Sequence, residues 1–368
     1  MLDSKGSSSV GSNPRTTASR STVRRTNRFG ARTAVRTFAI SRTPIVLELN
    51  HSQILRVGYA EQTKPHHTLS LEEFTSHDTS KPFSLNQNLT DTQWYNVLSP
   101  VISKVYDRLM CNPTTRRVVC VLPHLASSNL IKALQQLLWN KGVPAVTVWS
   151  NLEILPVAQG WKRGLIVHVS KDETVSVCHS DGHLLPYTYQ SVPIGYGNLM
   201  IQPEQEQEQE QDQEEAKENK LQVEWTPAME DLFLNENNPN SAVIAVLKTM
   251  EECPTDVRHN CVSNIVFAGE GSLLFPDLSR RVIQRVKSIL EGNPTPLKLV
   301  TPEQEIMTHT PVKTKSLAAL APKLQLISTY PHRPDWICWL GASLWAAAWN
   351  KYDDEESSIQ WTFSPTDE

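Results

Sequence analysis

The residues best suited to chemistry in this chain form one loop, Gly269-Glu270-Gly271-Ser272. Residues 265–268 before it are apolar and are predicted to form a strand, while Val282, Val286 and Ile289 after it recur at helical spacing. Because glycine has no side chain, the backbone N–H groups of such a loop can approach a phosphate or an adenosine closely. Two glycines between a strand and a helix are more common as plain α/β architecture, so the loop alone does not define a ligand site.

The composition limits the classes of function. With 368 residues, the chain can form one large domain or two moderate domains with a substantial core. The net charge of −4 conceals two opposite poles, because residues 1–43 carry eight Arg and one Lys against one Asp, whereas residues 204–218 carry eight acids and one Lys. The remainder is mildly acidic, so we expect no direct contact with nucleic acid.

The cysteines and the longest apolar run exclude further classes. The six cysteines form no Cys-x-x-Cys pair and no tight Cys/His cluster along the chain, so we predict no metal site, no disulfide framework and a reducing compartment. The apolar run 336–349 has 14 residues, which is too short to cross a bilayer. We expect a buried strand and helix there, and no membrane span.

Two polar stretches are predicted to lie outside the folded core. Residues 1–43 are rich in Ser, Thr and Arg and are predicted to be a disordered basic tail, with an organelle transit peptide or contact with an acidic surface such as a microtubule left open. Residues 202–220 are rich in Gln and Glu, and are predicted to be a disordered acidic insert because they are too polar to bury and repel one another.

The ordered part of the sequence repeats one plan. Predicted hairpins at 44–61 and 163–185 are each followed, later in the chain, by a predicted strand, loop and helix, at 117–138 and 264–290. A repeat of this size predicts two related α/β lobes that face each other across a cleft. Ligands would bind between the two hairpin turns.

This duplicated plan resembles the actin family, within the superfamily of actin, heat-shock ATPases and sugar kinases. The residues that carry the resemblance are ILRVGYAE (54–61), KGVPAVTVWSNLEILPVAQGWKRGLIVHV (141–169), CPTDVR (253–258) with NIVFAGEGSLLFP (264–276), and WICWLGASLWAAA (336–348). The resemblance implies a duplicated, two-lobed α/β fold with reduced small subdomains. Its first lobe would span 44–158, with 335–368 returning to it, and its second lobe would span 159–334.

The chain departs from the family in the turns that bind ATP phosphates. In the family, the first hairpin turn supplies an Asp and a Gly-Ser-Gly run, but residues 48–53 here read Glu-Leu-Asn-His-Ser-Gln. The second turn should read Asp-x-Gly-x-Gly, but residues 168–172 read His-Val-Ser-Lys-Asp. The acid that would hold Mg²⁺ through water and both glycines that would approach phosphate are therefore missing.

The residues that act on water in the family are also replaced. Asn151 stands for the glutamine that orients the attacking water, and Val175 stands for its histidine partner. We therefore expect no enzymatic activity and no required cofactor. Binding of ATP or ADP in a degenerate cleft stays open, and the residues that would contact it are Ser52, Gly269, Gly271 and Ser272.

The shortened regions suggest how such a chain would act. About 30 residues after the first hairpin and residues 197–240 replace the small subdomains that form the pointed end of an actin monomer. The profile resembles the actin-related proteins in the pointed-end complex of dynactin, which implies a non-catalytic cap in the cytoplasm and cytoskeleton. Its partners would be actin-like filament subunits, other pointed-end proteins and, indirectly, dynein, and its docking face would include Trp339, Leu344 and Trp345.

Two other classes remain open. A nuclear actin-related subunit of a chromatin-remodelling complex would also lack ATP-binding residues, and its basic tail could lie near nucleic acid. An active ATPase of the wider superfamily is disfavoured by the missing acid in the second turn. The identity of its partners would distinguish a chromatin-remodelling subunit from a filament cap. Turnover of ATP would identify an active ATPase.

Overall fold

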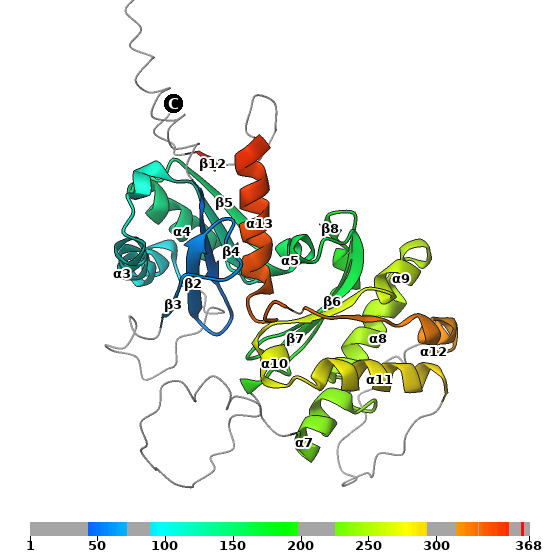
Figure 1. The fold of residues 1–368 in the computed structure, drawn as a ribbon. Coiled ribbons are helices and arrows are strands. Elements are labelled where there is room, and N and C mark those ends of the chain that lie inside the picture. Colours follow the sequence, from blue (N-terminus) through cyan, green and yellow to red (C-terminus); the bar gives the residue numbers. More distant parts are fainter. Residues whose placement is uncertain are drawn as a thin grey trace, which may run out of the picture.

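The fold was obtained as a computed structural model, which describes residues 43–71, 89–197, 225–292, 314–329, 331–352 and 362–363. The predicted acidic insert and all but the last residue of the predicted basic tail lie outside these residues. The chain is an α/β protein with two mixed sheets, as predicted (Figure 1).

The first sheet is built around the first hairpin. Its strands have the order β12 (Thr362–Phe363), β5 (Ala145–Ser150), β4 (Val118–Leu122), β1 (Ile45–Leu49), β2 (Ile54–Tyr59) and β3 (His67–Ser70). Strand β1 pairs antiparallel with β2 and parallel with β4. All five residues of β1 are buried, because β1 lies at the centre of the sheet and both of its faces are covered.

The second sheet repeats this arrangement. Its strands have the order β11 (Leu326–Ile327), β10 (Ile265–Ala268), β6 (Arg163–Val169), β7 (Thr174–Ser180) and β8 (His183–Leu184), with β9 (Gln190–Val192) also paired to β7. Strand β6 pairs antiparallel with β7 and parallel with β10, as β1 does with β2 and β4. This shared order is compatible with two related lobes.

Helices cover both sheets. They are α3 (Asp91–Leu109), α4 (Ser128–Asn140), α5 (Asn151–Gln159), α7 (Pro227–Met229), α8 (Ala242–Glu252), α9 (Thr255–Val262), α10 (Glu270–Leu274), α11 (Leu278–Leu290), α12 (Thr314–Leu317) and α13 (Ile337–Tyr352). Several of these helices begin after a polar N-cap residue. Ser127 accepts a hydrogen bond from Leu130 N at the start of α4, and Ser150 and Glu153 form a capping box at α5.

Helix α13 joins the two sheets. One core cluster contains Val46 and Val119 of the first sheet, Ile166 and Val266 of the second, and Trp339 of α13. In Figure 1, α13 stands between the two halves of the molecule. The helix therefore shares one core with both sheets, and further along the chain β12 pairs with β5 of the first sheet.

The structure corrects two predicted elements. The run 336–349 was expected to hold a strand and a helix, but the residues described there form helix α13 without a strand. A helix satisfies its own backbone hydrogen bonds, which suits a segment buried between two lobes with no strand edge beside it. The predicted turn 269–272 instead begins helix α10. No described helix is both long and apolar enough to span a membrane.

Candidate functional site at the junction of the hairpin turns

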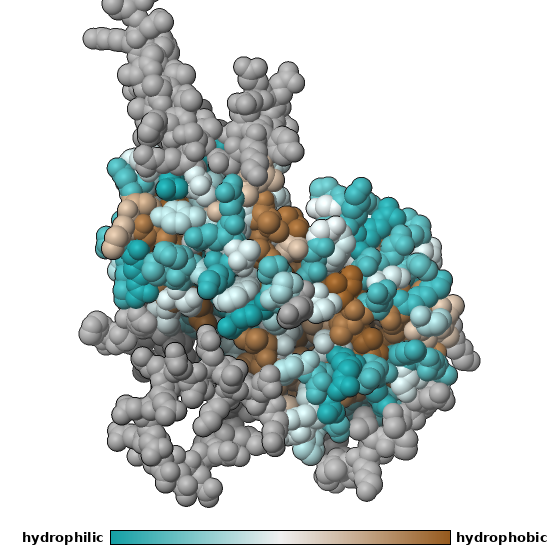
Figure 2. Space-filling view, viewed as in Figure 1, coloured by the Kyte–Doolittle hydropathy of each residue, from teal (hydrophilic) through white to brown (hydrophobic). Residues whose placement is uncertain are grey.

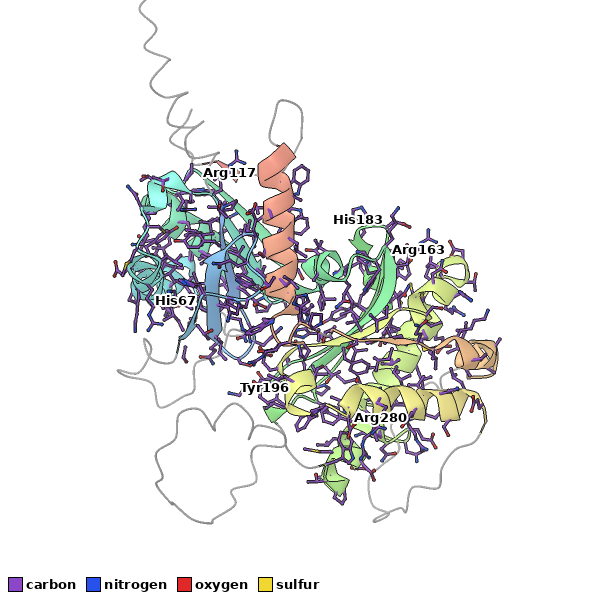
Figure 3. The ribbon with its side chains drawn as sticks, viewed as in Figure 1. His67, Arg117, Arg163, His183, Tyr196 and Arg280 are labelled. Atoms are coloured by element: carbon purple, nitrogen blue, oxygen red, sulfur yellow. The ribbon has the colours of Figure 1, made fainter. Side chains whose placement is uncertain are left out.

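The two hairpin turns meet where the resemblance would place phosphates. The hydroxyl oxygen atoms of Ser52, in the β1–β2 turn, and Tyr196 lie 2.5 Å apart. Asn50 donates a hydrogen bond from its side-chain amide to Glu270 of α10, and its Oδ1 atom accepts one from Ile54 N at 2.8 Å, which shapes the turn. Figure 3 places Tyr196 beside α10, away from His183 and Arg163 at the other end of the second sheet. The chain's own side chains therefore connect the lobes here.

A buried ionic network lies directly behind this contact. The guanidinium of Arg56 lies 3.3 Å from Glu48, 3.1 Å from the Asp335 carboxylate and 3.6 Å from Glu270, and donates to the Asp335 carbonyl at 2.7 Å. Arg56 and Glu48 are each 4 % exposed. Arg333, at the rim, also pairs with Asp335 at 3.0 Å. Burial raises the pKa of Glu48 to about 7, although the charge of Arg56 opposes this rise, and burial also raises the pKa of Glu270.

Three imidazoles occupy the other side of the junction. The rings of His51 and His124 are 5.3 Å apart, and those of His51 and His168 are 6.0 Å apart. His124 Nε2 lies 2.7 Å from the Tyr189 hydroxyl and 3.5 Å from Glu173 Oε1. Burial lowers the pKa of all three histidines, that of His124 to about 3. All three are therefore neutral at physiological pH.

A nucleotide triphosphate does not fit this arrangement. Phosphate binding requires backbone N–H donors or cations, whereas this junction presents neutral imidazoles and the buried carboxyl groups of Glu48 and Glu270. The only cation in its interior among the described residues, Arg56, is already surrounded by carboxylates. Asn50 and His51, in the first turn, are each 8 % exposed, so other protein atoms cover both side chains.

The predicted nucleotide contacts have structural roles. Gly269 has φ +89°, and its N–H donates to the Pro334 carbonyl at 3.0 Å. The Ser272 hydroxyl donates to the Ala268 carbonyl at 3.0 Å. A Cβ atom at Gly271 would lie 2.3 Å from a Val169 methyl group. The two glycines therefore let α10 pack closely against the end of β6, which explains them without a ligand.

This packing role predicts a large effect for Gly269→Ala. An added Cβ would lie 2.4 Å from the Val169 carbonyl oxygen, in a backbone conformation that disfavours side chains. We expect a loss of roughly 2–3 kcal/mol in the free energy of unfolding, measured with urea. Gly182→Ala is the matched control, because Gly182 has φ +92° and a Cβ atom added there would have nothing within 4 Å. It should cost about 1 kcal/mol, and equal losses in both variants would contradict the packing role.

Asn151 and Val175, which the resemblance aligns with the family's catalytic pair, both lie in the interior of the protein. Val175 is completely buried in the core. Asn151 Nδ2 lies 3.4 Å from His168 Nε2, and Asn151 Oδ1 is buried without a hydrogen-bond partner among the described residues. Sequence reasoning missed Arg56 and Asp335. The available signal was a charged residue, Arg56, within the apolar strand ILRVGY.

A groove lies at the opposite end of the lobes from the hairpin turns. Its volume is about 560 Å³, and it is lined by Trp149, Glu153, Ile154, Pro156, Val157, Gly160, Trp161, Lys162, His179, Asp181, Gly182 and Trp345. The Trp345 ring stacks edge-on against Trp149 with a centroid distance of 5.3 Å. Figure 2 shows a hollow between α13 and the β7–β8 side, with hydrophobic residues over α13.

The three predicted interface residues differ in accessibility. Trp339 is completely buried, so its prediction as a docking residue is wrong in this structure, because its ring fills the core between the lobes. Leu344 is 44 % exposed. Trp345 is partly buried and lines the groove. The groove rather than Trp339 is therefore the candidate docking surface.

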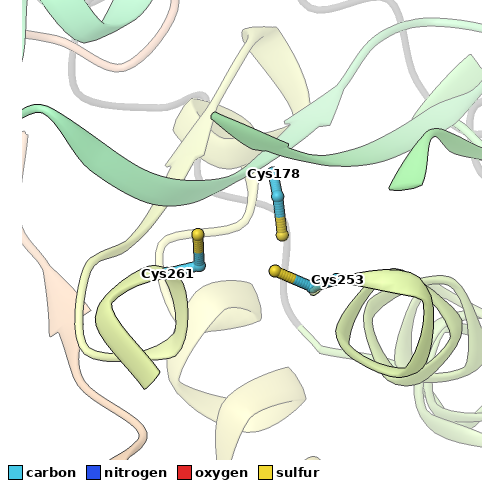
Figure 4. A group of neighbouring side chains, drawn as sticks. All are labelled: Cys178, Cys253 and Cys261. Carbon is cyan, nitrogen blue, oxygen red and sulfur yellow. The ribbon is translucent and has the colours of Figure 1, made fainter. Parts of the chain in front are cut away.

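Two groups of side chains have the composition of metal sites, although none was expected from the sequence. His51, His124 and Glu173 place their donor atoms within 4.8 Å of one another, as do Cys178, Cys253 and Cys261 (Figure 4). Cysteines and histidines that form no tight cluster along the sequence are therefore brought together by the fold. Apart from Cys253 and Cys261, which are eight positions apart, these residues are distant in the chain, so their spacing carries no signal of a site.

Comparisons with known proteins do not classify the chain further. A search of protein-family models and a search of curated proteins each found no match. The structure defines the class as an α/β protein with two mixed sheets of the same strand order.

Proposed function

We propose that this chain is a non-catalytic actin-related subunit that caps the pointed end of a short actin-like filament, as in dynactin. The observation that carries the proposal is the filled junction between the hairpin turns. The first sheet contains the strand order β3-β2-β1-β4-β5, and the second sheet contains the matching order β8-β7-β6-β10-β11. This repetition supports an actin-like, duplicated fold. The four sequence stretches that resemble the actin family include β2, the segment from β5 through α5 to β6, the start of helix α9 with β10 and α10, and most of α13.

The junction supports a structural rather than a catalytic role. In an ATPase of this type, bound nucleotide would connect the lobes. Here the connection is made by Arg56, which belongs to β2, and by its carboxylate partners Glu270 and Asp335. A lobe arrangement held by the protein itself does not need ATP binding or hydrolysis, and it presents one constant surface to a partner.

The groove supports docking through one end of the molecule. Its walls combine α5, the β7–β8 turn and Trp345 of α13, so both halves of the molecule contribute. Aromatic residues are enriched at the centre of protein interfaces. A segment of a filament subunit in this groove would attach the chain, while the regions shortened relative to actin would not accept a further subunit.

The nucleotide part of the proposal is tested with the purified full chain. We expect no release of phosphate from ATP and no saturable binding of a fluorescent ATP analogue with Mg²⁺. The buried carboxyl groups at the junction exclude the triphosphate, and Asn151 and Val175 supply no catalytic pair. Mg²⁺-dependent turnover that is abolished by a substitution at the junction would overturn the non-catalytic role.

The docking part is tested by Val157→Asp, because Val157 is 38 % exposed and lines the groove. A buried charge in the interface should weaken binding by roughly 2 kcal/mol or more, about thirtyfold. Affinity purification of the tagged chain from its own cells, followed by mass spectrometry, should recover dynactin filament and pointed-end subunits, and the variant should lose them.

Met110→Asp is the control for the docking test. Met110 is 93 % exposed at the end of α3, outside the groove, so this variant should keep the partners. Circular dichroism should show that both variants are folded. Full recovery of the same partners by folded Val157→Asp would contradict docking through the groove, and recovery of a chromatin-remodelling ATPase by the unmodified chain would overturn the filament assignment.

A further inference from the structure

Three cysteines from separate elements converge in the second lobe. Cys178 is on β7, Cys253 is at the C-cap of α8, and Cys261 is in α9. Their sulfur atoms lie within 4.8 Å of one another, and no cysteine of the three is more than 1 % exposed. Figure 4 shows the three thiol groups directed into one space.

Core packing explains each cysteine alone but not their convergence. A buried free cysteine commonly acts as a small hydrophobic residue. The chain has six cysteines, however, and three of them meet at one point, whereas Cys111, Cys120 and Cys338 do not join a comparable group of described residues. Three sulfur donors also exceed the two that a disulfide would use.

A cation lies beside the three thiols. The Arg258 guanidinium donates to the Cys253 carbonyl at 2.6 Å and to the Glu251 carbonyl at 2.9 Å, so it is held beside the cluster. A thiolate rather than a thiol is the form that binds metal.

We propose that Cys178, Cys253 and Cys261 form a binding site for one Zn²⁺ ion. Tetrahedral zinc with Zn–S bonds of about 2.3 Å requires sulfur atoms roughly 3.8 Å apart, which a small contraction of the cluster provides. Three thiolates around Zn²⁺ leave a net charge of −1, and the Arg258 cation offsets it. A monovalent ion such as Cu⁺ would leave −2 in the same buried space, so the charge balance favours zinc.

The binding step involves protons and no electrons. Cysteine binds zinc as a thiolate, so each thiol of the group would release one proton to solvent as its Zn–S bond forms. The described residues supply three donor atoms to this group, and a tetrahedral zinc ion would take one further ligand. The ion would tie β7, α8 and α9 together, and this site does not depend on the proposed filament function.

The test uses the full chain purified under reducing conditions without chelator. We expect about one zinc per chain by inductively coupled plasma mass spectrometry. After chelation, Co²⁺ should produce the intense near-ultraviolet absorption of thiolate-to-metal charge transfer, and Zn²⁺ should displace it. Release of protons as Zn²⁺ is added, measured in a weakly buffered solution containing a pH indicator, would match the proposed step.

Variants separate metal binding from packing. Cys253→Ser should lose zinc and the Co²⁺ absorption, whereas Cys120→Ser should keep both, because Cys120 is equally buried but lies outside the cluster. If Cys253→Ser does not fold, the Co²⁺ titration of the unmodified chain still shows whether the three cysteines bind a metal ion. Unmodified protein without zinc and without a Co²⁺ signal, a disulfide between two of the three cysteines, or stoichiometric copper in place of zinc would each overturn the proposal.

Discussion

Arg56→Met is expected to lower the free energy of unfolding by roughly 3–5 kcal/mol, the usual cost of removing one partner from a buried ionic group. Met keeps most of the volume of the side chain but removes the cation that Glu48, Glu270 and Asp335 surround. Three buried carboxyl groups would then face one another, and Arg333 reaches only Asp335. Urea unfolding at neutral pH measures the loss, and a decrease below about 1 kcal/mol would contradict the role given to Arg56.

Arg163→Met is the matched control for this prediction. Arg163 also pairs with a carboxylate, that of Asp181 at 2.9 Å, but the two side chains are 36 % and 56 % exposed. Solvent screens such a pair, so its loss should leave the free energy of unfolding almost unchanged. The two substitutions therefore compare a buried arginine that faces three carboxyl groups with an exposed arginine that faces one.

The second large effect concerns pH. Burial raises the pKa of Glu48 from 4.5 to about 7, which corresponds to roughly 3 kcal/mol between the two protonation states. Because the folded-state pKa lies above the unfolded one, the contribution of Glu48 to stability is fully present below about pH 4.5 and is lost as the pH rises through about 7. Glu48 should therefore destabilise the chain as it ionises.

Glu48→Gln should remove this dependence. Glutamine has the shape of the protonated acid, so the variant should match the unmodified chain near pH 4.5 and exceed it above pH 7 by up to roughly 3 kcal/mol. The difference between the two unfolding curves is the relevant measurement, because the buried histidines change stability in the opposite sense. Their lowered pKa values reduce stability as the pH falls below 6.5. A constant difference from pH 4.5 to 7 would refute the raised pKa.

Much of the fold could be predicted because local patterns determine it. The apolar runs of both hairpins form β1 and β2, and β6 and β7. The Leu-rich stripe after Ser127 forms α4, within the predicted strand, loop and helix at 117–138. Trp339 shows the limit, since the same apolar sequence suits a core helix or a docking face, and only packing between two sheets distinguishes them.

The sequence by itself determined most of the elements, their order and the residue types in the two hairpin turns. These properties follow from side-chain periodicity, capping and residue type, which act within a few positions along the chain. Only the tertiary structure decided which side chains meet at those turns and inside the second sheet's core. Arg56 and Asp335 are 279 positions apart, and the thiols of Cys178, Cys253 and Cys261 meet across three elements. Such contacts depend on how the sheets and helices pack, which no local pattern specifies.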